Sequence, residues 1–280
     1  SLGQPKRSYE ITDDKYSTFM DLYCRALIEN NNILYLSERH LAFGPLVVDI
    51  DIKYHLSEET LAHRYTLEDI EMFIRLYNKY IVMYINIDDD EKMDVYLLEK
   101  KTSTLKGHED GAYNYKDGVH IMYPNLCVPV NLQHIIRENV IVEIKKNGLW
   151  NHLLMDNNIE DVVDKAVIDK NNWLMYGSGK PGAENNRYVL SRIYHMDMTV
   201  LEYDDMDQID KYELPKKLSV RKYSSDEICE LAQDYTWEKI EKIFATLSCF
   251  RRKKNVIDTT VENVRIAHKL VSMLSVDRVD

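Results

Sequence analysis

The sequence has few cysteines, and none is arranged for a structural site. Four occur in 280 residues (Cys24, Cys127, Cys229 and Cys249), they are widely separated, and no C-x-x-C pair is present. A disulfide framework needs dense cysteines and a four-thiolate zinc site needs close pairs, so we expect neither. This cysteine usage is what we expect of a protein from a reducing, intracellular compartment.

Long apolar runs and targeting segments are also missing. No stretch approaches the ~18 consecutive apolar residues that a membrane helix needs, so we expect no membrane partner. The start, SLGQPKRSYE, lacks the apolar core of a signal peptide, and without an initiator Met it leaves open an excised fragment or a tag. No internal repeat or low-complexity tract appears.

Positive charge is in short supply. The chain has 36 Lys and Arg residues against 47 Asp and Glu residues, which gives a net charge of −11. Proteins that bind nucleic acids normally carry a basic surface, so this balance taken alone argues against such a partner. The apolar content of 45% nevertheless supports a large buried core at this length.

The order of the hydrophobic patterns predicts an α+β protein. Helices are expected at 15–30, 67–81 and 131–146, and strands at 46–52, 95–99, 119–123 and 173–176. We expect a polar loop at 100–117, the end of a strand at Pro124 and a helix cap at Asn131. Capping boxes are predicted at Thr66/Asp69, Ser224/Glu227 and Thr259/Glu262.

A change in composition near residue 205 predicts three parts. Residues 1–205 form the α+β domain, 206–222 form a connector of mixed charge, and 223–280 form a small helical C-terminal region. An apolar seam within 261–274 supports the last helix.

Two acids alternate in an otherwise apolar strand, LVVDIDI. Asp49 and Asp51 point to the same face about 6–7 Å apart, because side chains alternate along a strand. Buried carboxylates repel each other unless a cation lies between them, and oxygen ligands favour Mg²⁺ or Mn²⁺. The alternative is an edge strand with two solvated acids. Since both faces of this strand are apolar, we prefer the metal site.

Two further segments carry chemistry. His120 follows Gly118 on a predicted strand, which is typical either of an imidazole exposed to a ligand or of a satisfied core histidine. Gly177-Ser178-Gly179-Lys180 presents a lysine from small residues, but the G-x-x-x-x-G-K-[ST] motif is absent, so a P-loop NTPase is excluded. The segment is otherwise a turn with an exposed lysine.

In this order the motifs resemble the archaeo-eukaryotic primase superfamily, the primase-polymerase group. PLVVDIDIKY, LLEKK, YKDGVHIMYP and LMYGSGKP are similar to the primase half of primase-helicases from nucleocytoplasmic large DNA viruses, over about residues 35–200. The final LVSMLSVDRVD resembles the segment that leads into the helicase, so we expect a fragment cut before it. The resemblance implies an RRM-like mixed or antiparallel sheet.

The resemblance also implies roles for individual residues. Asp49 and Asp51 match the first two metal ligands, and His120 matches the histidine that contacts the phosphates of the nucleotide. Asp164 is preferred over Asp169 as the third ligand. When the family's pattern of residues is aligned from Asp164, its final lysine corresponds to Lys180.

The sequence departs from the family's pattern at two places, and the resemblance implies two further residues of the site. Gly118 replaces a usual serine, and Leu174-Met175 replaces a basic residue. Gly118 and Ser178 are then expected to line the nucleotide site with His120 and Lys180.

The implied activity is template-directed nucleotidyl transfer on single-stranded DNA, with nucleoside triphosphates as substrates and two Mg²⁺ or Mn²⁺ ions about 3.5–4 Å apart. The implied partner is a helicase domain of the same polypeptide, and the implied location is the cytoplasm of an infected cell. A metal-dependent nucleotide-sugar glycosyltransferase and a catalytically silent DNA-binding module are the alternatives. Because of the net charge, we expect weak, salt-sensitive DNA binding, with Lys100, Lys101, Lys180 and 216–222 on the DNA side.

Overall fold

The computed structural model describes residues 8–30, 32–184, 186–201 and 209–254, and the chain forms two compact units. The first unit spans Ser1–Thr236, and the second spans Trp237–Asp280. Helix α8 (Trp237–Lys254) is the described part of the second unit. The capping box predicted at Thr259/Glu262 lies outside the described residues, and the division of the chain at 205 and 222 stays a prediction.

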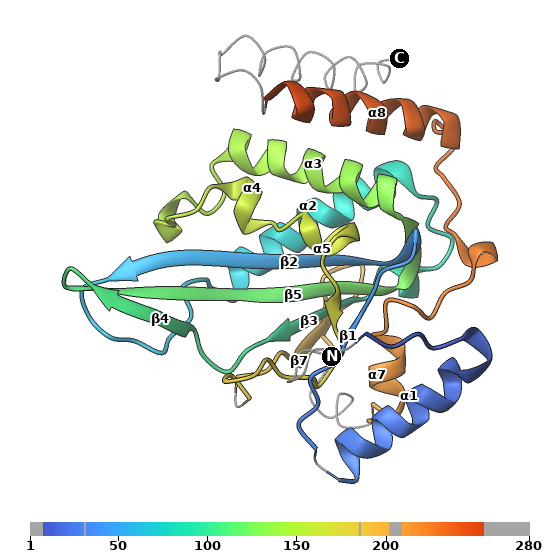
Figure 1. Cartoon of the computed structure of the whole chain (residues 1–280). Helices are drawn as coiled ribbons and strands as arrows, with labels where there is room; N and C mark the ends of the chain where they lie inside the picture. The colour runs from blue at the N-terminus through green and yellow to red at the C-terminus, as the bar shows by residue number, and fades with distance from the viewer. Residues whose placement is uncertain (1–7, 31, 185, 202–208, 255–280) are drawn as a thin grey trace. The chain divides into compact units, whose positions relative to one another are not determined.

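An antiparallel sheet forms the centre of the first unit (Figure 1). Its strands follow the order β2 (Phe43–Leu56), β5 (Ala112–Pro129), β3 (Val95–Glu99) and β7 (Val189–Tyr194), and β4 (Thr104–Glu109) pairs with the first residues of β5. A separate pair joins β1 (Ser37–Glu38) to β6 (Trp173–Leu174). The predicted α+β fold with an antiparallel sheet and flanking helices is confirmed.

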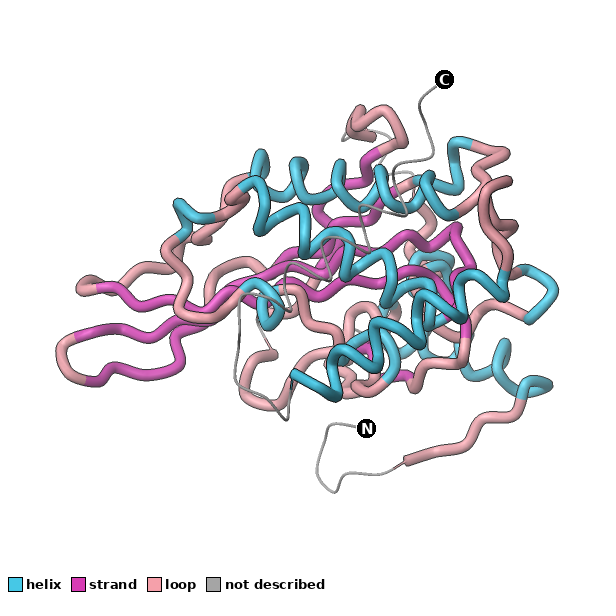
Figure 2. The backbone as a smooth tube through the Cα atoms, turned by 90° about the horizontal axis from the view of Figure 1, so that it is seen from above, coloured by secondary structure: helices cyan, strands magenta, loops and turns pink. Residues whose placement is uncertain are grey.

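Helices lie on both sides of this sheet. In Figure 1, α2 (Leu67–Tyr84) and α3 (Val130–Asn147) lie on one side, and α1 (Asp13–Ile28) and α7 (Glu213–Lys217) lie on the other. The shorter helices are η1 (Asp90–Met93), η2 (Asn151–Leu153), α4 (Ile159–Val162), α5 (Ala166–Asp169) and η3 (Ser225–Glu227). Figure 2 shows the hairpin of β4 and β5 extending beyond the helices. No helix among the described residues is both long and apolar enough to cross a bilayer.

Both faces of the central strands are buried, as the apolar run around Asp49 predicted. On one face, Val47 and Met122 belong to a core cluster with Trp173 and Tyr188. Ile50 alternates with these positions, so it points to the opposite face, and it is fully buried. The acids at 49 and 51 therefore share their face with a packed apolar cluster.

Capping explains where two helical segments begin. The predicted box at α2 is present, because the Thr66 hydroxyl accepts a hydrogen bond from the Asp69 amide and the Asp69 carboxylate accepts one from the Thr66 amide at 2.8 Å. The box at Ser224/Glu227 is also present, at η3. The cap predicted at Asn131 is wrong: the N-cap of α3 is Pro129, two residues earlier, and its fixed φ suits the position before a helix.

The polar loop predicted at 100–117 is wrong. Most of it is the hairpin of β4 and β5, which turns at Asp110 and Gly111 with φ values of 51° and 80°. Several β4 side chains are exposed, so the segment lacks the apolar alternation that marks a half-buried strand.

The end predicted at Pro124 is also wrong, because β5 continues to Pro129. Leu46 pairs with Tyr123, but the preceding Pro45 pairs with Cys127, so β5 carries extra residues opposite this point. The bulge leaves Pro124, which has no N–H to donate, outside the ladder. In addition, the strand predicted at 173–176 is confined to β6, and β7 was not predicted.

Candidate active site

Two neighbouring strands carry the first four candidate residues. The register of β2 and β5 pairs Asp49 with His120 and Asp51 with Gly118. Residues directly opposite each other in an antiparallel ladder point to the same face. The two acids predicted from alternation therefore share one face with the predicted histidine and glycine.

The third acid reaches this face from the open edge of β2. Val163 forms an antiparallel bridge with Ile50, and the Asp164 amide donates to the Asp49 carbonyl at 2.9 Å. One carboxylate oxygen from each of Asp49, Asp51 and Asp164 lies within 4.8 Å of the others. Such a set of three oxygens fits a hard divalent cation.

Asp169, the alternative third acid, lies elsewhere. It is in α5, and one of its carboxylate oxygens is 3.5 Å from Nε2 of His134 on α3. It is not part of the acidic cluster found among the described residues. The structure thus brings Asp164 to the other two acids and leaves Asp169 apart from them.

Asp49 is in a strongly unfavourable setting for a charge. Burial, and after it the negative charge of Asp51, raises the pKa of Asp49 to about 7, although Lys116 and Lys180 act in the opposite direction. One of its carboxylate oxygens is buried and has no hydrogen-bond partner. A buried, unpaired acceptor beside two more carboxylates is what a cation site presents before the cation binds.

Three lysines surround the acids. Nζ of Lys116 is 2.7 Å from a carboxylate oxygen of Asp51. Lys100 lies with Nζ 4.5 Å from the ring centre of Tyr188, and burial, followed by repulsion from Lys180 and Lys116, lowers its pKa to about 8. Lys180 was predicted at the site and Lys100 on its DNA side, but Lys116 was missed. Strand alternation could have indicated Lys116, because residues 116, 118 and 120 point to one face of the strand.

His120 is held between aromatic rings. Its ring is stacked 3.6 Å from that of Tyr188, measured between centroids, and is 4.5 Å from that of Trp173. Burial, and after it the charges of Lys100, Lys180 and Lys116, lowers the pKa of His120 well below its ordinary value. The imidazole is therefore neutral, with one N–H to donate. Nε2 is 3.6 Å from the buried oxygen of Asp49.

Ser178 forms its hydrogen bonds with residues outside the acidic cluster. Its hydroxyl accepts a hydrogen bond from the Leu36 amide at 3.1 Å and lies 3.0 Å from the Tyr23 hydroxyl. It lines the same apolar pocket as His120 and Trp173. Its nucleotide-binding role, like the roles of Gly118 and Lys180, stays a prediction.

The comparison with protein families identifies the domain that carries this site. Residues 1–194 match the family model described as the C962R protein N-terminal AEP domain, where AEP denotes archaeo-eukaryotic primase. The chain belongs to the archaeo-eukaryotic primase family. The match covers every residue of the acidic cluster and all three lysines, and it confirms the resemblance drawn from the motifs.

Relatives of this primase domain occur in large DNA viruses. It is 34% identical over 176 residues to a protein of Acanthamoeba polyphaga mimivirus provisionally named helicase L207/L206, with 63% of the chain and 17% of the relative covered. It is 27% identical over 211 residues to a protein of Invertebrate iridescent virus 6 provisionally named helicase 184R, with 69% and 21% covered. The chain therefore spans about a fifth of the length of these relatives.

Proposed function

We propose that this primase domain is a DNA primase and polymerase, which transfers nucleotides to a growing strand on a single-stranded DNA template. The observation that carries the proposal is the meeting of three carboxylates from distant segments beside three lysines. Family membership supports the same class of reaction. Nucleoside triphosphates are the substrates that this combination of charges fits.

Asp49, Asp51 and Asp164 are proposed to hold Mg²⁺ or Mn²⁺. The orphaned oxygen of Asp49 and the spacing of the three acids fit such an ion. Two bound ions would divide the work, one activating the attacking 3′-hydroxyl and the other neutralising the leaving pyrophosphate. The chain itself supplies the fixed carboxylates on β2 and at its edge.

His120 and the lysines are proposed to hold the triphosphate. The neutral imidazole is fixed by its aromatic neighbours and offers an N–H donor to a phosphate oxygen. Lys100, Lys116 and Lys180 supply positive charge beside the acids, and ammonium groups bind phosphate as point charges. Catalysis then comes mainly from positioning and charge stabilisation.

Primer synthesis and primer extension on single-stranded DNA test this function. Asp49→Asn and Asp164→Asn are expected to reduce nucleotide incorporation by about 10²-fold or more, because each removes a metal ligand. Asp169→Asn is the matched control, since its carboxylate lies outside the cluster, and it is expected to keep wild-type activity. Full activity of the Asp49 variant would disprove the proposal.

The alternatives give different results in simple assays. DNA binding without incorporation would favour a silent replication module. Thermal stabilisation by sugar nucleotides with Mn²⁺, and not by nucleoside triphosphates, would favour a glycosyltransferase.

For the whole polypeptide we propose a helicase part as partner, on the names of the relatives and the small share of them that the chain covers. The cytoplasm of an infected cell stays the predicted location.

A further inference from the structure

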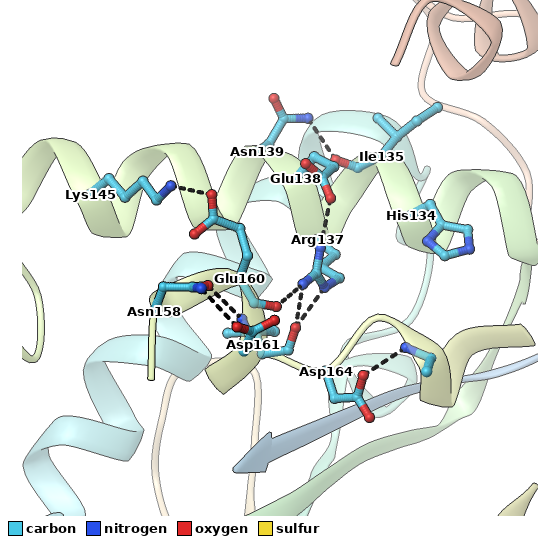
Figure 3. Close-up of polar contacts among 12 residues, drawn as sticks. His134, Ile135, Arg137, Glu138, Asn139, Lys145, Asn158, Glu160, Asp161 and Asp164 are labelled. Carbon is cyan, nitrogen blue, oxygen red and sulfur yellow. Dashed lines mark hydrogen bonds and ion pairs between the residues drawn. The ribbon is translucent and has the colours of Figure 1, made fainter. Parts of the chain in front are cut away.

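A buried arginine contacts the segment that carries the third acid (Figure 3). Arg137 on α3 is only 2% exposed. Its Nε donates to the Val163 carbonyl at 2.8 Å, and Nη2 donates to the Glu160 carbonyl at 2.6 Å and also to that of Val163. Nη1 pairs with the carboxylate of Glu138 at 2.6 Å. The guanidinium therefore binds the main chain immediately before Asp164.

These two carbonyls belong to a very short helix and its C-cap: Glu160 lies within the helix and Val163 follows its last residue. Helix α4 has four residues, Ile159–Val162, and so small a helix is not stable by itself. The last carbonyls of a helix have no partner within it and carry partial negative charge. The Asn158 side chain caps the start of α4, and Arg137 binds carbonyls at its end.

Directly after α4, the chain pairs with the edge of β2. Val163 bridges Ile50, and the Asp164 amide donates to the Asp49 carbonyl. The Asp164 carboxylate also accepts a hydrogen bond from the Ala166 amide at 2.9 Å. The segment is thus fixed between α3 on one side and the edge of β2 on the other.

We propose that Arg137 is a positioning residue for the metal centre, which holds the 160–163 backbone so that Asp164 meets Asp49 and Asp51. This inference rests on the proposed function. Burying a guanidinium is costly, and an apolar side chain of similar size often serves stability as well or better. An apolar side chain could pack here, but it could not bind the two carbonyls that set the position of Asp164.

Amide hydrogen exchange without metal tests the positioning itself. In Arg137→Met the Asp164 amide is expected to exchange at least about tenfold faster than in the wild type, because its bond to the Asp49 carbonyl opens more often. Lys145→Met is the matched control: Lys145 is also on α3 and pairs with Glu160, but through its exposed side chain. It is expected to leave this amide protected. Unchanged protection in a folded Arg137→Met protein would overturn the proposal.

Titration with Mn²⁺ tests the consequence for the metal centre. Arg137→Met is expected to weaken Mn²⁺ binding by about 10–100-fold, the usual effect of losing a group that orients a ligand. Arg137→Lys keeps the charge but not the planar fork, so an intermediate loss is expected. If Arg137→Met does not unfold cooperatively in urea, Arg137→Lys takes its place in both measurements.

A double variant separates positioning from a general structural role. In an Asp164→Asn background, Arg137→Met is expected to cause no further loss of Mn²⁺ affinity, since Arg137 acts through Asp164. An equal further loss there would contradict the inference. If wild-type protein binds Mn²⁺ no better than Asp49→Asn, the proposed function fails instead, and the exchange result still decides what Arg137 does.

Discussion

Gly118 faces Asp51 across the β2–β5 ladder with no room for a side chain. A Cβ added there would lie 1.7 Å from the Ile50 carbonyl oxygen, and the φ of 155° is one that residues with side chains rarely adopt. The backbone at this position therefore requires glycine in place of the serine that is usual in the primase family. It brings the two main chains close together beside the acids.

Gly118→Ala is expected to destabilise the protein by more than about 1 kcal/mol, because the backbone must shift to admit a methyl group. Gly107→Ala is the control, since nothing lies within 4 Å of a Cβ at this position. The control is expected to stay within about 0.5 kcal/mol of the wild type. Urea unfolding measures both, and equal stability of the two variants would contradict the explanation.

Single residues of the site differed in how far the sequence could predict them. Asp49 and Asp51 followed from strand alternation, because that pattern is local, whereas the role of His120 was implied only by the family resemblance. Asp164 and Asp169 both follow an apolar residue, and only the contact with the edge of β2 separates them in space. Lys116 was missed because the strand that carries it was read as a loop.

At the scale of elements, a buried carboxylate on β5 connects the sheet to the segment before α2. Asp117 is fully buried and accepts hydrogen bonds from the ring of His63 at 2.9 Å and from the Arg64 amide at 2.8 Å. The hydrogen bond to Asp117 is the largest cause of a raised pKa at His63, although burial of the ring acts the other way. This interaction makes the stability of the connection depend on pH.

The direction of the pH dependence follows from the raised pKa of His63. The contribution of protonated His63 to the free energy of unfolding is fully present below the ordinary histidine pKa of about 6.5. It is lost as pH rises through the higher pKa that His63 has in the folded protein. The stability difference between the wild type and His63→Gln is therefore expected to shrink as pH rises above about 6.5. His108→Gln, at an exposed position on β4, is the control and is expected to show no such trend. Urea unfolding across this pH range would contradict the account if the His63 difference grew.

Elements were predictable where one face is apolar over several residues. The helices at α1, α2 and α3 and the strand β3 follow such patterns. The β4–β5 hairpin and the bulge at Pro124 do not, because exposed strands carry polar side chains and a bulge depends on the partner strand. Tertiary pairing, and not local propensity, determines these parts.

At the scale of the whole molecule, the net charge of −11 has to be reconciled with the DNA partner that we propose. Three acids are used in the proposed metal centre, and the three lysines near them offset the charge of these acids. Long-range repulsion from the remaining acids still opposes a polyanion.

We therefore expect weak binding of single-stranded DNA that falls steeply with salt. Fluorescence anisotropy with a labelled oligonucleotide, measured with Mg²⁺ at about 50 and 200 mM salt, tests this expectation. Lys101→Met, at an exposed position, is expected to weaken binding and to reduce the salt dependence, whereas Lys145→Met, on α3, is expected to change neither. Tight binding that is insensitive to salt would contradict the charge argument.

The pairing of Val163 with Ile50 at the edge of β2 also has a consequence for when the proposed metal site forms during folding. Asp49 and Asp51 are neighbours in the chain, but Asp164 lies more than a hundred positions later. Closing so long a loop is slow and comes after local structure has formed. A partly folded chain would present two acids without the third. High-affinity metal binding would then appear only once Val163 has paired with β2, so that a chain without this pairing lacks the complete proposed metal site.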